Sequence, residues 1–257
     1  MRAALVALML LALPAKAEQR VALELVLAVD VSTSIDASEF RLQRIGLVRA
    51  FRHPGVRAAI LSQGDAGIAV AVVQWAGKGR QRPAVDWMFL DDEPAIRRLS
   101  NRIGAMSRLT GGFTDIAGAV RFSTQWIETN AFQGERKVID VSGDGVADQG
   151  DPPAARDAAV ALGIVVNGLV IDPQEYDLGA LAADALFRHY ERDVTGGPGS
   201  FVLKAAGFED FTRAIREKLI REITGPAFVE VAPRLHAFRA QAPASMSQGN
   251  PTGIRPQ

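Results

Sequence analysis

Five oxygen-bearing side chains lie just after apolar runs or in a glycine-flanked loop, where a metal ion could reach them. They are Asp30, Ser32, Ser34, Thr114 and Asp144. The first three are spaced i, i+2 and i+4, so a chain leaving a strand can turn one carboxylate and two hydroxyls toward the same point. Two carboxylates and three hydroxyls suit a hard cation such as Mg²⁺, which prefers oxygen ligands and keeps several waters. These residues therefore predict a divalent-cation site for Mg²⁺, or alternatively for Mn²⁺ or Ca²⁺.

A cation held in this way keeps coordination positions for an outside anion. Hydroxyl ligands add no charge, so an incoming carboxylate gains a strong electrostatic contact when it completes the coordination shell. The predicted partner is a protein that presents an Asp or Glu side chain, and we expect binding, not catalysis. A hydrolase would also need a general base or nucleophile, for which only Asp115 or Asp148 is available. A periplasmic Mg²⁺-dependent hydrolase and a metal-free structural domain remain the alternatives.

Strand and helix patterns alternate along the segment that contains these residues. Apolar runs predict strands at 23–31, 67–75, 84–90, 137–141, 164–171 and 200–204, with 84–90 as a short antiparallel edge strand. Amphipathic patterns predict helices at 39–52, 56–61, 96–106, 115–129, 152–162, 176–190 and 208–223. The predicted fold class is α/β: a doubly wound, mostly parallel six-stranded sheet with helices on both faces. In such a sheet the carboxyl ends of the strands share one edge, which would bring the candidate ligands together.

The same residues carry a resemblance to a known family. Asp30-x-Ser32-x-Ser34, Thr114 after paired glycines, and Asp144-Gly145 after an apolar strand resemble the metal-ion-dependent adhesion site (MIDAS) of von Willebrand factor A-type (VWA) domains. The resemblance spans about residues 21–223 and implies a VWA/Rossmann-like fold. It also implies direct or nearly direct metal contact for the first Asp and both Ser residues, and direct or water-mediated contact for Thr114 and Asp144. More narrowly, the chain resembles an exported bacterial branch of uncharacterised VWA-like proteins.

Two positions near the candidate ligands depart from the family pattern. Ser142-Gly143 precedes Asp144 where the family usually has a threonine, and Phe113 is inserted between the paired glycines and Thr114. Asp115 is an alternative ligand in this loop, although its place before a helix favours an N-cap. Asp148 and Asp151 either contact waters of the ion or form a solvated acidic turn, and we expect the turn.

The two ends of the chain differ from the predicted domain at 18–225. Residues 1–17 have a basic start, an apolar stretch and the ending Ala-Lys-Ala, which is typical of a secretory signal peptide. The apolar stretch is too short to span a bilayer, so we expect export to the periplasm or beyond, without stable membrane insertion after cleavage. Residues 226–257 are rich in Pro, Ser, Gln and Ala and predict a disordered tail.

Composition and missing motifs exclude several other classes of protein. The chain has no cysteine, which excludes disulfides and thiolate metal sites, and its 29 basic residues balance 29 acidic ones. This balance gives no general attraction to nucleic acid. There is no Gly-x-Ser-x-Gly and no nucleotide-binding glycine motif, and the three histidines, His53, His189 and His236, lack zinc-ligand spacing. The tryptophans Trp75, Trp87 and Trp126 are expected to be core or half-buried anchors.

Overall fold

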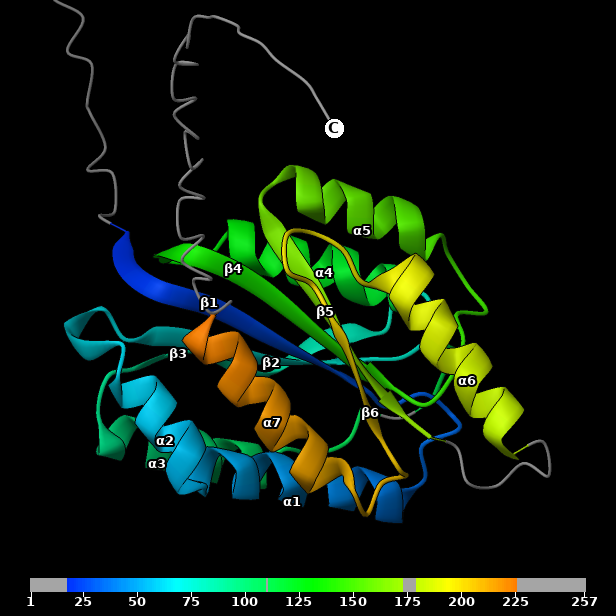
Figure 1. Cartoon of the computed structure of the whole chain (residues 1–257), viewed down its shortest axis with the longest axis horizontal. Coiled ribbons are helices and arrows are strands. Elements are labelled where there is room, and N and C mark those ends of the chain that lie inside the picture. The colour runs from blue at the N-terminus through cyan, green and yellow to red at the C-terminus, as the bar shows by residue number, and fades with distance from the viewer. Residues whose placement is uncertain (1–17, 110, 173–178, 226–257) are drawn as a thin grey trace, which may run out of the picture. The chain divides into compact units, whose positions relative to one another are not determined.

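A six-stranded sheet with strand order β3-β2-β1-β4-β5-β6 forms the centre of the fold (Figure 1). The structure, a computed structural model, describes residues 18–109, 111–172 and 179–225. The strands are β1 (Gln19–Asp30), β2 (Ile68–Trp75), β3 (Gln81–Leu90), β4 (Phe132–Gly143), β5 (Ile164–Ile171) and β6 (Val202–Ala205). Only the β2–β3 pairing is antiparallel among these neighbours. The predicted α/β fold class, with its antiparallel edge strand, is therefore confirmed.

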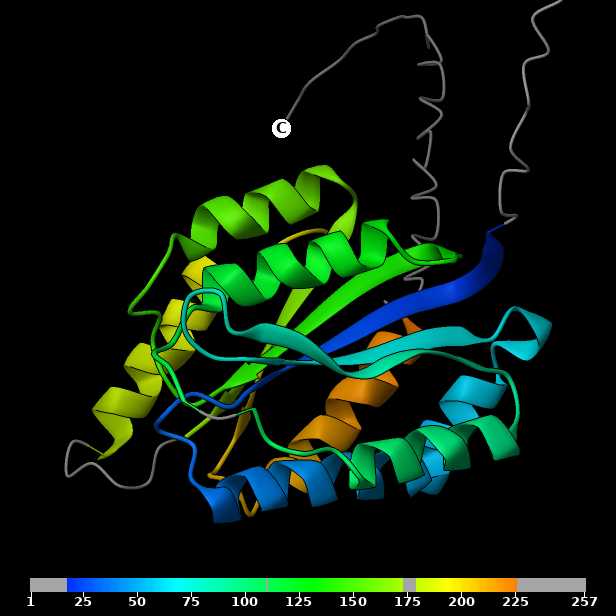
Figure 2. The ribbon, with the colours of Figure 1, turned by 180° about the vertical axis from the view of Figure 1, so that it is seen from behind.

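Helices cover both faces of this sheet (Figures 1 and 2). One layer consists of α1 (Ala37–Arg52), α2 (Pro54–Leu61), α3 (Glu93–Gly104) and α7 (Phe211–Thr224). The other consists of α4 (Ile116–Glu128), α5 (Pro152–Ala161) and α6 (Gly179–His189), which continues into the π-helical turn η2 (Tyr190–Val194). A short 3₁₀ turn, η1 (Gly64–Ala66), precedes β2.

The central strand β1 shows how its sequence produces two cores. Leu25 and Leu27 pack into the core beneath α1, α3 and α7, whereas Val26 and Ala28 pack into the core beneath α4 and α5. A strand with parallel neighbours on both sides and helices on both faces must be apolar on both faces. For this reason the strand appears in the sequence as a continuous apolar run rather than an alternating one.

The start of α1 is set by local chemistry. The Asp36 carboxylate accepts hydrogen bonds from the backbone amides of Ser38 and Glu39, and Glu39 accepts one from the Asp36 amide, which completes a capping box. The chain therefore has only residues 31–35 in which to pass from the end of β1 into the helix. This short connection contains two of the candidate ligands, Ser32 and Ser34.

Several elements extend beyond the predicted bounds. β4 begins at Phe132 and β1 at Gln19, because the first residues of the two strands pair with each other in parallel register. β3 begins at Gln81 and includes Pro83, which an edge strand tolerates because it has a side without a partner strand. The predicted signal peptide and tail lie outside the described residues. Within those residues, no helix is long and apolar enough to cross a membrane.

Candidate metal site

The candidate ligands lie at the edge of the sheet where the parallel strands end. β1 ends at Asp30 and β4 ends at Gly143, and the two strands are direct neighbours with Val29 opposite Ser142. The chain therefore leaves the sheet at adjacent positions on its way to Ser32 and to Asp144. This is the juxtaposition that the strand order of the fold imposes.

Hydrogen bonds connect four of the five predicted ligands into one row. The Ser34 hydroxyl donates to Asp144 Oδ1 over 2.9 Å, and the Ser32 and Ser34 hydroxyl oxygens lie 3.1 Å apart. The backbone amide of Ser32 donates to Asp30 Oδ1 over 2.7 Å. Two carboxylates and two hydroxyls from separate strand ends thus share one small volume.

The fifth candidate, Thr114, is held against the loop that carries Asp144. The Thr114 amide donates to Asp148 Oδ1 over 2.9 Å, and the Asp148 amide donates to the Thr114 carbonyl over 3.2 Å. A Cβ on Gly145 would lie 3.7 Å from Thr114 Oγ1. We expected Asp148 in a solvated acidic turn, and this expectation was incomplete, because its exposed carboxylate also positions Thr114. The partner lies 34 residues away, beyond what a local pattern can indicate.

The Thr114 loop is also tied to the loop after β1. Both the amide and the hydroxyl of Thr33 donate to the Gly112 carbonyl, over 3.0 and 2.6 Å. Gly112 has φ +126°, and a Cβ there would lie 2.7 Å from the Gly77 amide nitrogen, so a side chain cannot be accommodated. Asp115 is buried and caps α4 by accepting from the Gly118 amide over 2.7 Å, which confirms its predicted N-cap position.

The electrostatics of the site disfavour the charged forms of its two carboxylates. Asp30 is wholly buried, and its Oδ2 has no hydrogen-bond partner within the described part of the chain. Burial and then the charge of Asp144 raise the pKa of Asp30 to about 8, and burial also raises the pKa of Asp144. Hydrogen bonds from Ser32, and then the charge of Arg108, lower the pKa of Asp30 but only partly offset this rise. The Arg108 guanidinium donates to the Ser32 and Ile35 carbonyls.

These properties fit a hard divalent cation. Two carboxylates with raised pKa, an orphaned carboxylate oxygen and adjacent hydroxyls form an oxygen donor set of the kind that Mg²⁺ takes. In the described ranges, no group of three or more His, Cys, Asp or Glu side chains gathers in a way that could hold a metal. A metal site here would therefore depend on the hydroxyls as well as on the two carboxylates.

Gly143 and Tyr190 border the site next to Asp30, and neither was predicted to take part in it. A Cβ on Gly143 would lie 2.6 Å from the Tyr190 hydroxyl and 2.8 Å from Asp30 Oδ2. The Tyr190 hydroxyl is buried without a hydrogen-bond partner among the described residues, and burial followed by the charge of Asp30 raises its pKa. Gly143 is thus the residue that lets the carboxylate and the hydroxyl approach the same point. Nothing in the spacing of the sequence links residue 190 to residue 30.

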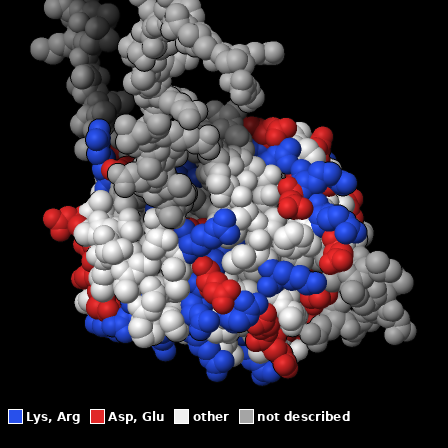
Figure 3. Space-filling view, in the orientation of Figure 1, with Lys and Arg blue, Asp and Glu red and all other residues white. Residues whose placement is uncertain are grey.

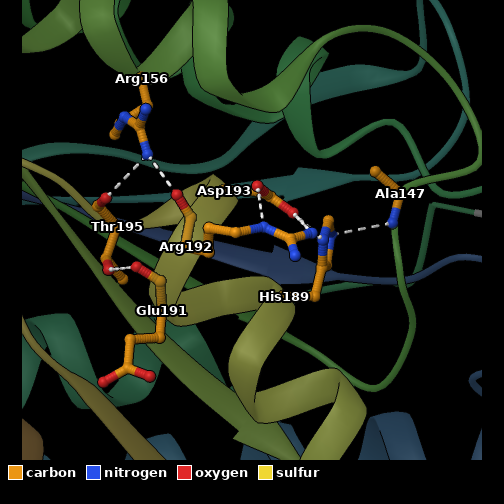
Figure 4. A network of polar contacts seen from close by, with 7 residues as sticks. All are labelled: Ala147, Arg156, His189, Glu191, Arg192, Asp193 and Thr195. Atoms are coloured by element: carbon orange, nitrogen blue, oxygen red, sulfur yellow. Dashed lines mark hydrogen bonds and ion pairs between the residues drawn. The ribbon is translucent and has the colours of Figure 1, made fainter.

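A polar network from η2 braces the loop that carries Asp144 (Figure 4). His189 Nε2 accepts the Ala147 amide over 3.3 Å, while His189 Nδ1 lies 2.9 Å from Asp193 Oδ2. A ring that accepts at Nε2 carries its proton on Nδ1 and donates it to Asp193. Arg156 of α5 donates to the carbonyls of Arg192 (2.8 Å) and Thr195 (3.2 Å), which anchors η2 itself.

The sheet order, the two helical layers and the oxygen-rich edge together define a VWA-like α/β domain, and solved structures share this fold. The VWA domain of SpRpn10 has a TM-score of 0.55 at 7% identity, covering 79% of this chain and 98% of that one. BatB from Bacteroides thetaiotaomicron has a TM-score of 0.51 at 15% identity, covering 79% and 100%. Proximal thread matrix protein 1 (PTMP1) from the mussel byssus has a TM-score of 0.53 at 18% identity, covering 80% and 49%.

These similarities are similarities of fold, and the chain spans only about half the length of the mussel protein. A further structure of PTMP1 has a zinc-occupied MIDAS motif. The chain belongs to the family described as "Protein of unknown function (DUF1194)", whose model matches residues 20–227. No curated protein matches it.

Proposed function

We propose that this protein is an exported binding module that captures a carboxylate of a protein partner through a divalent cation. The ligands would be Asp30, Ser32, Ser34, Thr114 and Asp144. The observation that carries the proposal is the hydrogen-bonded row from Asp30 to Asp144, which includes a buried carboxylate oxygen with no partner among the described residues. The cation, when bound, would supply a positive centre that accepts an outside carboxylate.

Each element of the site has a separate part in this function. Asp30 and Asp144 supply the negative charge that attracts the cation, and the hydroxyls supply neutral oxygens that do not weaken its attraction for an anion. Arg108, which holds the carbonyls of Ser32 and Ile35, adds positive charge beside the place where a partner carboxylate would bind. The zinc-occupied MIDAS motif of PTMP1 supports the idea that this fold can hold a metal there.

Binding is favoured over hydrolysis because the two candidate bases are engaged elsewhere. The Asp115 carboxylate caps α4, and the Asp148 carboxylate accepts the Thr114 amide. The surface drawn in Figure 3 shows basic and acidic side chains intermingled, which does not favour a nucleic-acid partner. Export rests on the signal-peptide pattern of residues 1–17, which places the proposed partner outside the cytoplasm.

Calorimetric titration of the purified protein with Mg²⁺ and Mn²⁺ tests the metal site. We expect one site, and we expect Asp144→Ala to weaken the affinity about tenfold or more, because one of two charged ligands is lost. Asp65→Ala is the matched control, since Asp65 is an exposed carboxylate in η1, and it should leave the affinity unchanged. Equal affinities for the wild type and Asp144→Ala would refute the site.

Capture of exported proteins with Mg²⁺ and with a chelator tests the partner. Thr114→Ala should reduce capture more than it reduces metal affinity, because one neutral hydroxyl adds little to ion binding but shapes the positions open to a partner. Blocking the carboxylates of the captured protein should abolish its retention. Asp115→Asn keeps a capping side chain and should leave capture intact. If Asp115→Asn abolishes capture while Thr114→Ala does not, the assignment in this loop is wrong by one residue.

A further inference from the structure

A second concave site lies where α4 ends, away from the candidate metal ligands. Its cavity of about 450 Å³ is lined by Asp86 and Trp87 of β3, Trp126 of α4, and Asn130 and Phe132 at the start of β4. This volume falls within the range of sites that take small molecules or single side chains. We propose that the cavity binds a methylated ammonium group, carried either by a free small molecule or by a modified lysine side chain.

The aromatic rings of this cavity are held at an angle to each other. The Trp87 indole N–H donates to the Trp126 carbonyl over 3.2 Å, which ties the edge strand to the last turn of α4. The ring centroids of Trp87 and Phe132 lie 6.2 Å apart with their planes tilted by 54°. The Phe132 amide donates to Asn130 Oδ1 over 2.5 Å, which fixes the turn before β4. Trp87 and Phe132, tilted in this way, line one corner of the cavity and do not stack on each other.

The charges around the cavity favour a cation. Asp86 is exposed, and its carboxylate accepts the Trp87 amide over 2.8 Å but forms no ion pair with any described residue. α4 ends beside it at Glu128 with no basic residue in its last turn, so the negative end of the helix dipole is not offset from within the helix. The Lys137 ammonium, which lies near this end, already pairs with Glu128 over 2.8 Å.

A methylated ammonium group satisfies both the rings and the carboxylate. Aromatic faces attract cations through their quadrupoles, and a methylated cation loses less hydration than a bare ammonium when it enters an aromatic corner. An anion would be repelled by Asp86, and a neutral apolar guest would gain nothing from that residue.

The two proposed sites are separate in space. α4 runs for 13 residues from its cap at Asp115, beside Thr114, to this cavity, which is about 20 Å at the usual rise per residue. The ammonium site therefore does not depend on the proposed metal site, and either can fail without the other.

Titration of the ¹⁵N-labelled protein with choline, followed by the indole N–H signals, tests the proposal. The signals of Trp87 and Trp126 should shift, whereas that of Trp75, which is fully buried in β2, should not. The uncharged isostere 3,3-dimethylbutan-1-ol has the same shape as choline and should bind more weakly by about fivefold. N-acetyl-trimethyllysine amide tests the side-chain source, and binding of either cation supports the proposal.

Two variants test whether the charge of Asp86 contributes to choline binding. Asp86→Asn should weaken choline binding by about fivefold, as expected for a partly exposed charge pair. Asp91→Asn changes an exposed carboxylate just after the same strand that does not line the cavity, and it should leave binding unchanged. Equal binding of choline and its neutral isostere would overturn the proposal, because the cavity would then be merely apolar. Absence of binding by both cations would overturn it as well.

Discussion

Replacing Lys218 by methionine should destabilise the protein by about 4 kcal/mol. Lys218 lies in α7 and is fully buried, with its ammonium 2.9 Å from Asp140 Oδ1 and 2.5 Å from Glu222 Oε1. Methionine is similar in length and apolar, so packing against the sheet is nearly kept. The change removes the charge that serves two buried carboxylates, and removing one partner of a buried ion pair costs about 3–5 kcal/mol.

The magnitude follows from the free-energy cost of protonating a buried carboxylate that has lost its cationic partner. Without Lys218, the carboxyls of Asp140 and Glu222 must take up protons. At pH 7.5 this costs about 1.4 kcal/mol for each unit by which the pH exceeds the ordinary pKa. Burial already raises the pKa of Glu222 to about 7, so little further cost arises there. The cost falls mainly on Asp140, whose pKa is raised by burial but lowered by the Lys218 ammonium that the variant removes.

Urea unfolding at pH 7.5, followed by circular dichroism, measures this loss. Lys204→Met is the matched control, because Lys204 pairs with Asp172 over 3.2 Å at the surface, where the change should cost less than about 1 kcal/mol. Combining Lys218→Met with Asp140→Asn and Glu222→Gln should recover most of the lost stability. The reasoning fails if Lys218→Met costs no more than the control, or if the neutral triple variant is no more stable than the single one.

Three further predictions concern Glu222, Gly143 and His189. Burial raises the pKa of Glu222 to about 7, so the native state binds more protons than the unfolded chain, and the free energy of unfolding should fall as pH rises from about 4.5 to about 7. The urea midpoint of Glu222→Gln should depend less on pH across this range, and an unchanged slope would contradict the assignment. Gly143→Ala places a Cβ 2.6 Å from the Tyr190 hydroxyl and should cost about 2 kcal/mol in thermal unfolding, part of which Tyr190→Phe should restore. His189→Leu removes the acceptor of the Ala147 amide and should weaken Mg²⁺ affinity about fivefold. His189→Gln keeps an acceptor and should weaken the affinity less, and equal losses of affinity would show that the hydrogen bond is not responsible.

Local patterns in the sequence were sufficient for the elements and for the first half of the site. The apolar run of β1 and the amphipathic pattern of α1 depend on neighbouring residues alone, and both elements lie where these patterns predict them, although β1 begins earlier. Ser32 and Ser34 follow from the same short segment. Asp144 could be placed beside them only through the rule that parallel strands end at one edge, which the observed β1–β4 pairing satisfies.

The lengths of the strands were harder to predict from the sequence, because pairing with a neighbouring strand, not composition, decides where a strand starts. The first residues of β4, Phe132 to Arg136, are largely polar and gave no strand signal, yet they pair in register with the start of β1. A polar strand end is stable when a neighbouring strand supplies its backbone partners and solvent receives its side chains. The partner strand lies more than a hundred residues earlier in the chain.

Only the tertiary structure decided which residues meet when they lie far apart in the sequence and belong to no motif. Lys218 lies on the same buried face of α7 as Ile215, and only the tertiary structure reveals that its ammonium meets Asp140. Tyr190 and His189 lie in a segment with no motif, yet the first reaches the space behind Asp30 and the second holds the loop of Asp144. Sequence periodicity determines which face of an element is apolar, because that depends on the element alone. Which polar group meets which depends on how elements from different parts of the chain pack, and a single sequence does not encode that as a local pattern.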